Sequence, residues 1–155
     1  MRSASAFLMK FFRIACIILF PLYVVELLAV TIFFPGRSDD NIYKHYFIPL
    51  QGTMALIHDP AQYDIERYWW HFATGLAGNF LLLLPLSFFL RYFTGLKKNT
   101  LLLIAVSTSI TIEILQLVLN IGVCDIDDVI LNSAGGLAGI YFFNLLNKVF
   151  KLKPR

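Results

Sequence analysis

The stretch TIEILQLVLNIGVCDIDDVILNSAGG, residues 111–136, decides the fold class of this chain. It joins two long apolar segments through a short turn that holds three aspartates. A helix that crosses a bilayer needs roughly 17–25 mostly apolar residues. Four segments of the chain meet that requirement: Ile14–Phe34, Phe72–Leu90, Leu101–Ile121 and Val129–Leu146. We therefore predict an all-α integral membrane bundle of four transmembrane helices.

The composition and the charge pattern support this class and give an orientation. The 155 residues are 58% hydrophobic and 15% charged, whereas soluble domains are about half apolar and about a quarter charged. Ten of the 13 basic residues lie in three segments without acids: the tail 1–13, the loop between the second and third spans, and the tail 148–155. The positive-inside rule then places both termini in the cytoplasm and the acidic loops outside. The basic residues would face anionic lipid headgroups, and no nucleic-acid partner is expected.

The outer loop between the first two spans, Pro35–His71, is long for a compact domain and rich in tyrosine and tryptophan. Such rings favour the headgroup zone. Its segment HYFIPLQGTMALI, residues 45–57, is too short to span and is predicted to lie at the membrane interface. Pro85 is expected to kink the second span. Cys16 and Cys124 fall near opposite membrane faces, so no disulfide between them is expected.

Polar side chains recur inside the apolar helices and share one depth. Ser109, Glu113, Gln116 and Asn120 are spaced by four, three and four residues, which places them on one helical face. With a rise of about 1.5 Å per residue, Glu113 and Glu26 lie roughly 12 Å below the outer ends of their spans, and Asn79 roughly 10 Å. We predict an outward-opening polar pocket with the aspartates at its mouth. The candidate ligand-binding residues are Glu26, Asn79, Glu113, Gln116, Asn120, Asp125, Asp127, Asp128 and Asn132.

Buried carboxylates in this pattern need an explanation. A charged residue at the bilayer centre costs at least ~2.5–3.5 kcal/mol, and no span contains a lysine or arginine that could pair with Glu26 or Glu113. Each carboxyl is therefore expected to be protonated or to reach water or a cation of the outer loop.

Structural interpretations compete with a binding role. The amide side chains can join helices by hydrogen bonds, and the GxxxG spacing from Gly135 to Gly139 favours close helix packing. One of the three aspartates, with Asp127 and Asp128 the first candidates, is expected to N-cap the fourth helix.

The segment IEILQLVLNIGVCDIDDVILNSAGGLAG resembles the signature of the VanZ-like family. The match runs through Glu113, Gln116, Asp125, Asp128 and Asn132, and continues to Gly135 or Gly136 and Gly139. The segments NFLLLLPLSFFL and YFIPLQGT resemble further motifs of the family, so the resemblance covers a transmembrane domain at 14–147. Two positions depart from the pattern: Gly122 stands where the family often has an arginine, and Ser87 where it has a glycine. The resemblance implies a protein of the bacterial cytoplasmic membrane, in a family named for a member linked to resistance to teicoplanin, a lipid-tailed glycopeptide.

Three functions stay open on the sequence. The preferred one is a non-enzymatic pocket for an amphiphile, such as an antibiotic tail or a lipid-linked wall precursor. The second is an enzyme with Glu113 as general acid or base and a divalent cation held by the aspartates, although no motif such as GxSxG or HExxH is present and no cofactor is expected. The third is a structural partner in an envelope complex. Transport is disfavoured because no inverted repeat is visible, and a homo-oligomer stays possible.

Overall fold

The computed structural model describes residues 2–33, 45–58 and 65–152, and in these ranges all the regular elements are helical. The elements are α1 (Arg2–Leu28), the π-helical turn η1 (Ala29–Phe33), α2 (Gln51–His58), α3 (Ile65–Leu82), α4 (Leu84–Thr94), α5 (Lys98–Leu119) and α6 (Ile126–Phe150). Within these described ranges, four stretches are long and apolar enough to cross a membrane: Met9–Ile32, Gly75–Thr94, Lys98–Leu119 and Ile126–Phe150. The predicted all-α bundle of four spans is confirmed.

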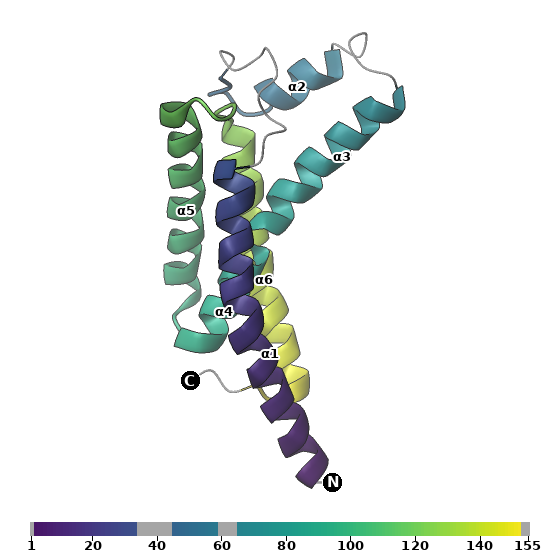
Figure 1. The fold of residues 1–155 in the computed structure, drawn as a ribbon, viewed down its shortest axis with the longest axis vertical. Helices are drawn as coiled ribbons and strands as arrows, with labels where there is room; N and C mark the ends of the chain where they lie inside the picture. The colour runs from purple at the N-terminus through teal and green to yellow at the C-terminus, as the bar shows by residue number, and fades with distance from the viewer. Residues whose placement is uncertain (1, 34–44, 59–64, 153–155) are drawn as a thin grey trace.

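Helix α6 is the central element of the bundle. Helices α3, α4 and α5 pack mainly on α6, while α1 contacts α4, and η1 contacts α5. Figure 1 shows α1, α5 and α6 running along the long axis, with α3 leaving the bundle obliquely and α2 lying across one end. Helix α1 begins and α6 ends at the opposite end (Figure 1). The start of α1 and the end of α6 therefore lie on one side, and the cytoplasmic placement of both termini stays a prediction from the charge pattern.

Glycines on α6 allow the second span to approach closely. A Cβ added at Gly135 would overlap the carbonyl oxygen of Phe80, and one added at Gly139 would overlap the carbonyl oxygen of Leu84. A backbone atom cannot move away as a flexible side chain can, so these positions require glycine. The interpretation of the GxxxG spacing as helix packing is confirmed.

The second span is broken where the sequence predicted a kink. Helix α3 ends at Leu82 and α4 begins at Leu84, with Pro85 in its first turn. Proline has no N–H to donate to the preceding turn, and in a bilayer exposed backbone groups need other partners. Next to the break, the hydroxyl of Tyr23 on α1 donates to the carbonyl of Leu82 at 2.7 Å.

Apolar side chains fill the half of the bundle where α1 begins and α6 ends, and they also cover its outside. The core cluster there consists of Cys16, Phe88, Phe89, Phe143 and Leu152. Leu22, Val25 and Leu103 are 60–66% exposed, as expected for side chains that face lipid. Cys16 and Cys124 are both free thiols.

Candidate functional site

The candidate site lies at the end of the bundle that carries α2, where the outer loop is paired with the turn between α5 and α6. The N–H of Tyr46 donates to the carbonyl of Cys124 at 2.9 Å, and the N–H of Ile126 donates to the carbonyl of Tyr46 at 3.0 Å. The N–H of Cys124 donates to Nδ1 of His45 at 3.2 Å. Backbone pairing thus fastens the loop directly beside the three aspartates.

Asp127 holds the start of α2 against the bundle. Its buried carboxylate accepts the N–H of Leu50 at 2.7 Å through Oδ1. Oδ2 accepts the hydroxyl of Thr53 at 2.8 Å and its N–H at 3.4 Å. The first amides of a helix have no partner within the helix and carry the positive end of its dipole. The Asp127 carboxylate supplies both the acceptors and the negative charge, so it docks α2 across the bundle end.

Asp125 is joined to Asp127 by a hydrogen bond, and Glu113 is joined to Asp125 in turn. Oδ1 of Asp125 accepts the N–H of Asp127 at 2.8 Å and so N-caps α6. The N–H of Asp125 donates to Oε2 of Glu113 at 2.9 Å. Glu113 is only 4% exposed, and this hydrogen bond compensates part of the cost of burying its carboxyl group. An aspartate caps α6 as expected, but it is Asp125 instead of Asp127 or Asp128, because the helix begins at Ile126 and the cap is the residue before it.

Two further side-chain pairs join the helices. Asn79 on α3 donates to the carboxylate of Asp128 on α6. Asn132 on α6 donates from Nδ2 to Oγ of Ser109 on α5 at 3.0 Å, and both of these residues are almost fully buried. The structure therefore brings polar residues of α3, α5 and α6 together at one end of the bundle.

Several acceptors in this region have no donor. Within the described residues, Oε1 of Gln116, Oδ1 of Asn132 and Oγ of Ser133 are buried without a hydrogen-bond partner. Gln116 is 3% exposed and Asn132 1% exposed. The protein thus satisfies its carboxylates with its own N–H groups but leaves amide oxygens of α5 and α6 open.

Two predicted residues lie outside this buried cluster. Glu26 is exposed on the surface of α1. Asn120 is exposed as well, and it ends α5 in the left-handed conformation at φ 51°, where its N–H bonds to the carbonyls of Gln116 and Leu117. Asparagine tolerates this conformation better than most residues, which explains Asn120 as a C-cap.

The three aspartates turn to different partners. Asp125 faces the start of α6, Asp127 the start of α2, and Asp128 faces Asn79. Among the residues that the structure describes, no group of three or more His, Cys, Asp or Glu side chains is arranged to hold a metal ion.

Sequence reasoning missed the loop residues that complete this layer. His45, Gly52 and Thr53 all contact the aspartate turn. The signal for Gly52 and Thr53 was the polar and small residues of the segment LQGT directly after Pro49. The predicted interfacial segment is thus a docked helix, α2, with its preceding turn.

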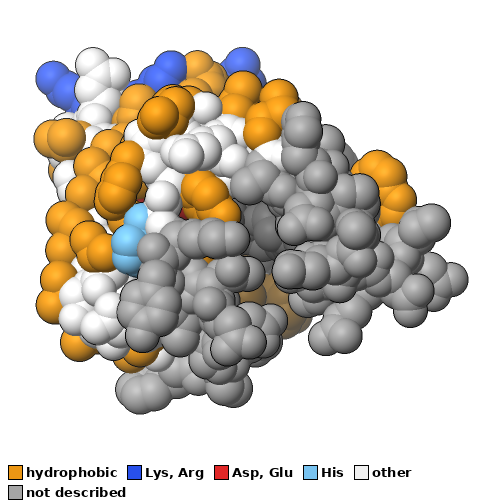
Figure 2. All heavy atoms as spheres, turned by 90° about the horizontal axis from the view of Figure 1, so that it is seen from above, with side chains coloured by type: hydrophobic (Ala, Val, Ile, Leu, Met, Phe, Trp, Pro, Cys, Tyr) orange, Lys and Arg blue, Asp and Glu red, His pale blue; other side chains and the backbone are white. Residues whose placement is uncertain are grey.

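The acidic side chains of the aspartate turn and Glu113 are largely covered at the surface, and three of them raise the pKa of a neighbouring thiol. Figure 2 looks onto this end of the molecule, and outside the grey atoms almost no acidic side chain is visible among the hydrophobic and uncharged groups. Burial raises the pKa of the Cys124 thiol, and the carboxylates of Glu113, Asp125 and Asp128 raise it further. The cluster is therefore an electronegative region.

A cleft of about 480 Å³ lies between the first span and α5. Its walls come from Leu27, Leu28, Thr31, Ile32, Leu103, Ile104, Ser107, Thr108, Thr111, Ile112 and Leu115. The hydroxyls of Thr31 and Thr111 donate to carbonyls of their own helices, at 2.7 and 2.8 Å, so the cleft is mainly apolar. Leu115, at one end of the cleft, directly precedes Gln116 in α5.

Four spanning helices with a buried acid and amide cluster at one end define a multi-pass membrane protein. The family model VanZ/LLP1 matches residues 14–147, which is most of the chain, and the protein belongs to that family. The resemblance noted in the sequence is thereby confirmed. Comparisons with curated proteins and with solved structures found no match.

Proposed function

We propose that this protein resides in the bacterial cytoplasmic membrane and binds an amphiphile of the cell envelope at its outer leaflet. The ligand class is a lipid-linked wall precursor or a lipid-tailed glycopeptide such as teicoplanin. Its polar head would occupy the cluster beneath α2. Membership of the VanZ/LLP1 family supports this assignment through the resistance protein for which the VanZ-like family is named.

The observation that carries the proposal is the pair of open acceptors, Oε1 of Gln116 and Oδ1 of Asn132. A buried polar group without a hydrogen bond costs about 1–3 kcal/mol. A ligand that donates to these oxygens would recover that free energy. Sugar hydroxyls and peptide amides are donors of this kind, and the electronegative surroundings also favour a donor over a further acceptor.

The apolar cleft supports an amphiphile over a free sugar or peptide. It runs along the face of α5 that is turned toward the first span, from Leu103 to Leu115 at the level of the cluster. Glu113 and Gln116 project from a different face of α5. An acyl or prenyl chain in this cleft would gain about 0.8 kcal/mol for each methylene removed from water. In a bilayer the gain is smaller, because the chain leaves lipid instead of water. The cleft therefore serves orientation more than affinity.

The test is Gln116→Met, which removes the open oxygen and keeps the length of the side chain. In the ligand-free protein we expect thermal unfolding in detergent to show a gain of about 1 kcal/mol, because an unsatisfied acceptor disappears. Binding of teicoplanin and of a short-chain lipid-linked wall precursor, measured by calorimetry, should weaken about tenfold for the true ligand, since one hydrogen bond contributes about 1.4 kcal/mol.

Gln51→Met is the matched control because Gln51 is exposed at the start of α2. It should change neither stability nor binding. If Gln116→Met destabilises the protein and leaves binding of both ligands unchanged, Gln116 is a helix-joining residue and the proposed site is wrong.

A further inference from the structure

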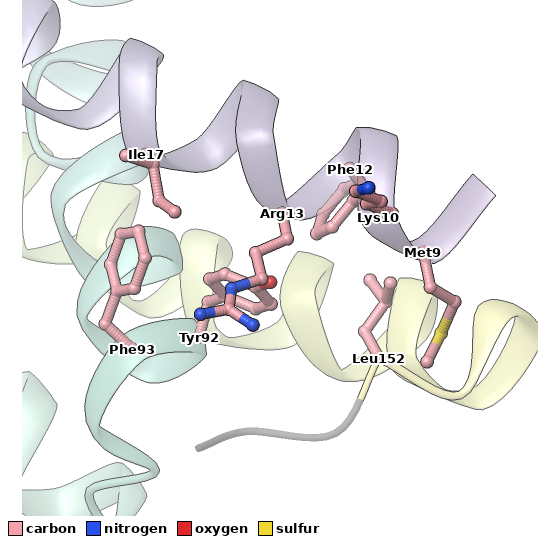
Figure 3. A pocket seen from close by; sticks show the side chains of 8 residues that line it. All are labelled: Met9, Lys10, Phe12, Arg13, Ile17, Tyr92, Phe93 and Leu152. Carbon is pink, nitrogen blue, oxygen red and sulfur yellow. The ribbon is translucent and has the colours of Figure 1, made fainter. Parts of the chain in front are cut away.

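A second cavity lies at the opposite end of the bundle and differs in character from the cluster beneath α2. It has a volume of about 380 Å³ and is lined by Met9, Lys10, Phe12, Arg13, Ile17, Tyr92, Phe93 and Leu152. The lining comes from α1, from the end of α4 and from the residue that follows the C-cap of α6. In Figure 3 the side chain of Arg13 reaches from α1 across the cavity toward Tyr92.

Ring contacts hold the walls of this cavity in place. Phe12 and Tyr92 meet edge to face with their centroids 5.5 Å apart. Phe93 contacts Phe20 of α1 with centroids 5.6 Å apart. Leu152 is 5% exposed and belongs to the core cluster. The hollow is thus bounded by packed groups of α1, of α4 and of Leu152 after the C-cap of α6.

The charges in the cavity are not neutralised by the described part of the protein. Lys10 and Arg13 are exposed, and the nearest acid along α1 is Glu26, about 20 Å from Arg13 at the rise of a helix. The other acids whose side chains the structure describes lie near the α2 end of the bundle, at Glu113 and in the aspartate turn. Two cations therefore face a concave surface that is otherwise aromatic and aliphatic.

We propose that this cavity binds an anionic phospholipid of the adjacent leaflet, with its phosphate at Lys10 and Arg13 and the upper part of one acyl chain against Ile17 and Phe93. Three features support this occupant. The span of α1 begins at Met9, so both cations stand at the level of the headgroups. Their charge complements a phosphodiester, which arginine binds in a bidentate manner. The apolar wall continues from the cations toward the bilayer interior.

The test compares the wild-type protein with Lys10→Gln/Arg13→Gln in detergent micelles, where membrane orientation plays no part. Native mass spectrometry would follow the retention of phosphatidylglycerol, with phosphatidylcholine as the neutral lipid. A cation near an anionic lipid surface contributes a factor of about 5 in affinity, so the double variant should lose about 25-fold. Arg13→Lys, which keeps the charge, should retain most of the binding.

The matched control is Lys97→Gln/Lys148→Gln, which removes two exposed cations near the same end of the bundle but outside the cavity. It should bind phosphatidylglycerol like the wild type. Competition by glycerol phosphate alone would identify a site for the free headgroup and contradict the acyl-chain part of the proposal. Equal losses in the two double variants would show a diffuse charge effect and overturn the cavity site.

Discussion

Gly52→Ala is the sharpest test of how the outer loop is held. A methyl group at position 52 would overlap Oδ2 of Asp125 and would lie 3.1 Å from a ring carbon of Tyr46. The Asp125 side chain cannot move freely, because its other oxygen caps α6 through the N–H of Asp127. The variant must therefore lift α2 or break that cap.

The expected change in the free energy of α2 docking in Gly52→Ala is the sum of opposing contributions. Alanine is the better helix former, which favours the variant by about 0.8–1 kcal/mol. Loss of an N-cap costs about 0.5–2 kcal/mol, and overpacking adds about 1–3 kcal/mol. The clash prevails, and docking of α2 should weaken by about 0.5–4 kcal/mol in net. Gly75→Ala makes the same chemical change where no atom lies within 4 Å of the new methyl group, so it should stabilise α3 by about 0.5–1 kcal/mol.

Hydrogen exchange measured by mass spectrometry in lipid nanodiscs separates these outcomes. In Gly52→Ala the amides of residues 45–58 should exchange at least about twice as fast, since 1.4 kcal/mol corresponds to a factor of ten. Exchange in α5 and α6 should change little. Unchanged protection of residues 45–58 in Gly52→Ala would refute the docking of α2 against Asp125.

Three further predictions concern single positions. Gly135→Ala should destabilise the bundle by about 3 kcal/mol, since the new methyl group meets the backbone of Phe80; thermal unfolding in detergent measures this, and an unchanged midpoint would contradict the packing. Asp127→Asn should weaken α2 docking by about 1–2 kcal/mol, because hydrogen bonds to a charged acceptor become neutral ones, and the same exchange experiment reports it. In a Cys16→Ala background, a membrane-impermeant maleimide should label Cys124 slowly at neutral pH and faster only above the usual thiol range, since burial and the nearby carboxylates raise the pKa of the thiol. Glu113→Gln should lower that pKa, so the rise of the labelling rate with pH should move to lower pH. Labelling only from the cytoplasmic side would overturn the topology.

The spans and the internal packing could be predicted because their causes are local. Run length alone identifies four bilayer-crossing helices. Pro85 favours a break because it lacks an N–H, although Pro21 lies inside the unbroken helix α1. The spacing of Gly135 and Gly139 predicts a close helix contact. The partner surface, which is the backbone of Phe80 and Leu84, was not predictable, because it depends on how the broken second span crosses α6.

The site was predicted in part. Helical spacing and depth brought Asn79, Glu113 and Asn132 to one end of the bundle. Their partners escaped prediction because most are backbone N–H groups or residues of the outer loop, as with Leu50 and Thr53 for Asp127. Periodicity gives the face of a helix but does not say whether a polar side chain on it meets a loop, another helix or open space. For the same reason the spacing could not show that Asn120 is a cap.

The hydrogen-bond chain also decides which variant can test binding. Glu113 holds the N–H of Asp125, Asp125 holds the N–H of Asp127, and Asp127 holds the start of α2. A change at any of these carboxylates propagates to the loop above, so lost binding would follow from undocking as readily as from a lost ligand contact. Oε1 of Gln116 does not belong to this series of hydrogen bonds, because it has no partner within the described protein. An effect of Gln116→Met on binding, with α2 exchange unchanged, therefore isolates the contact with the ligand.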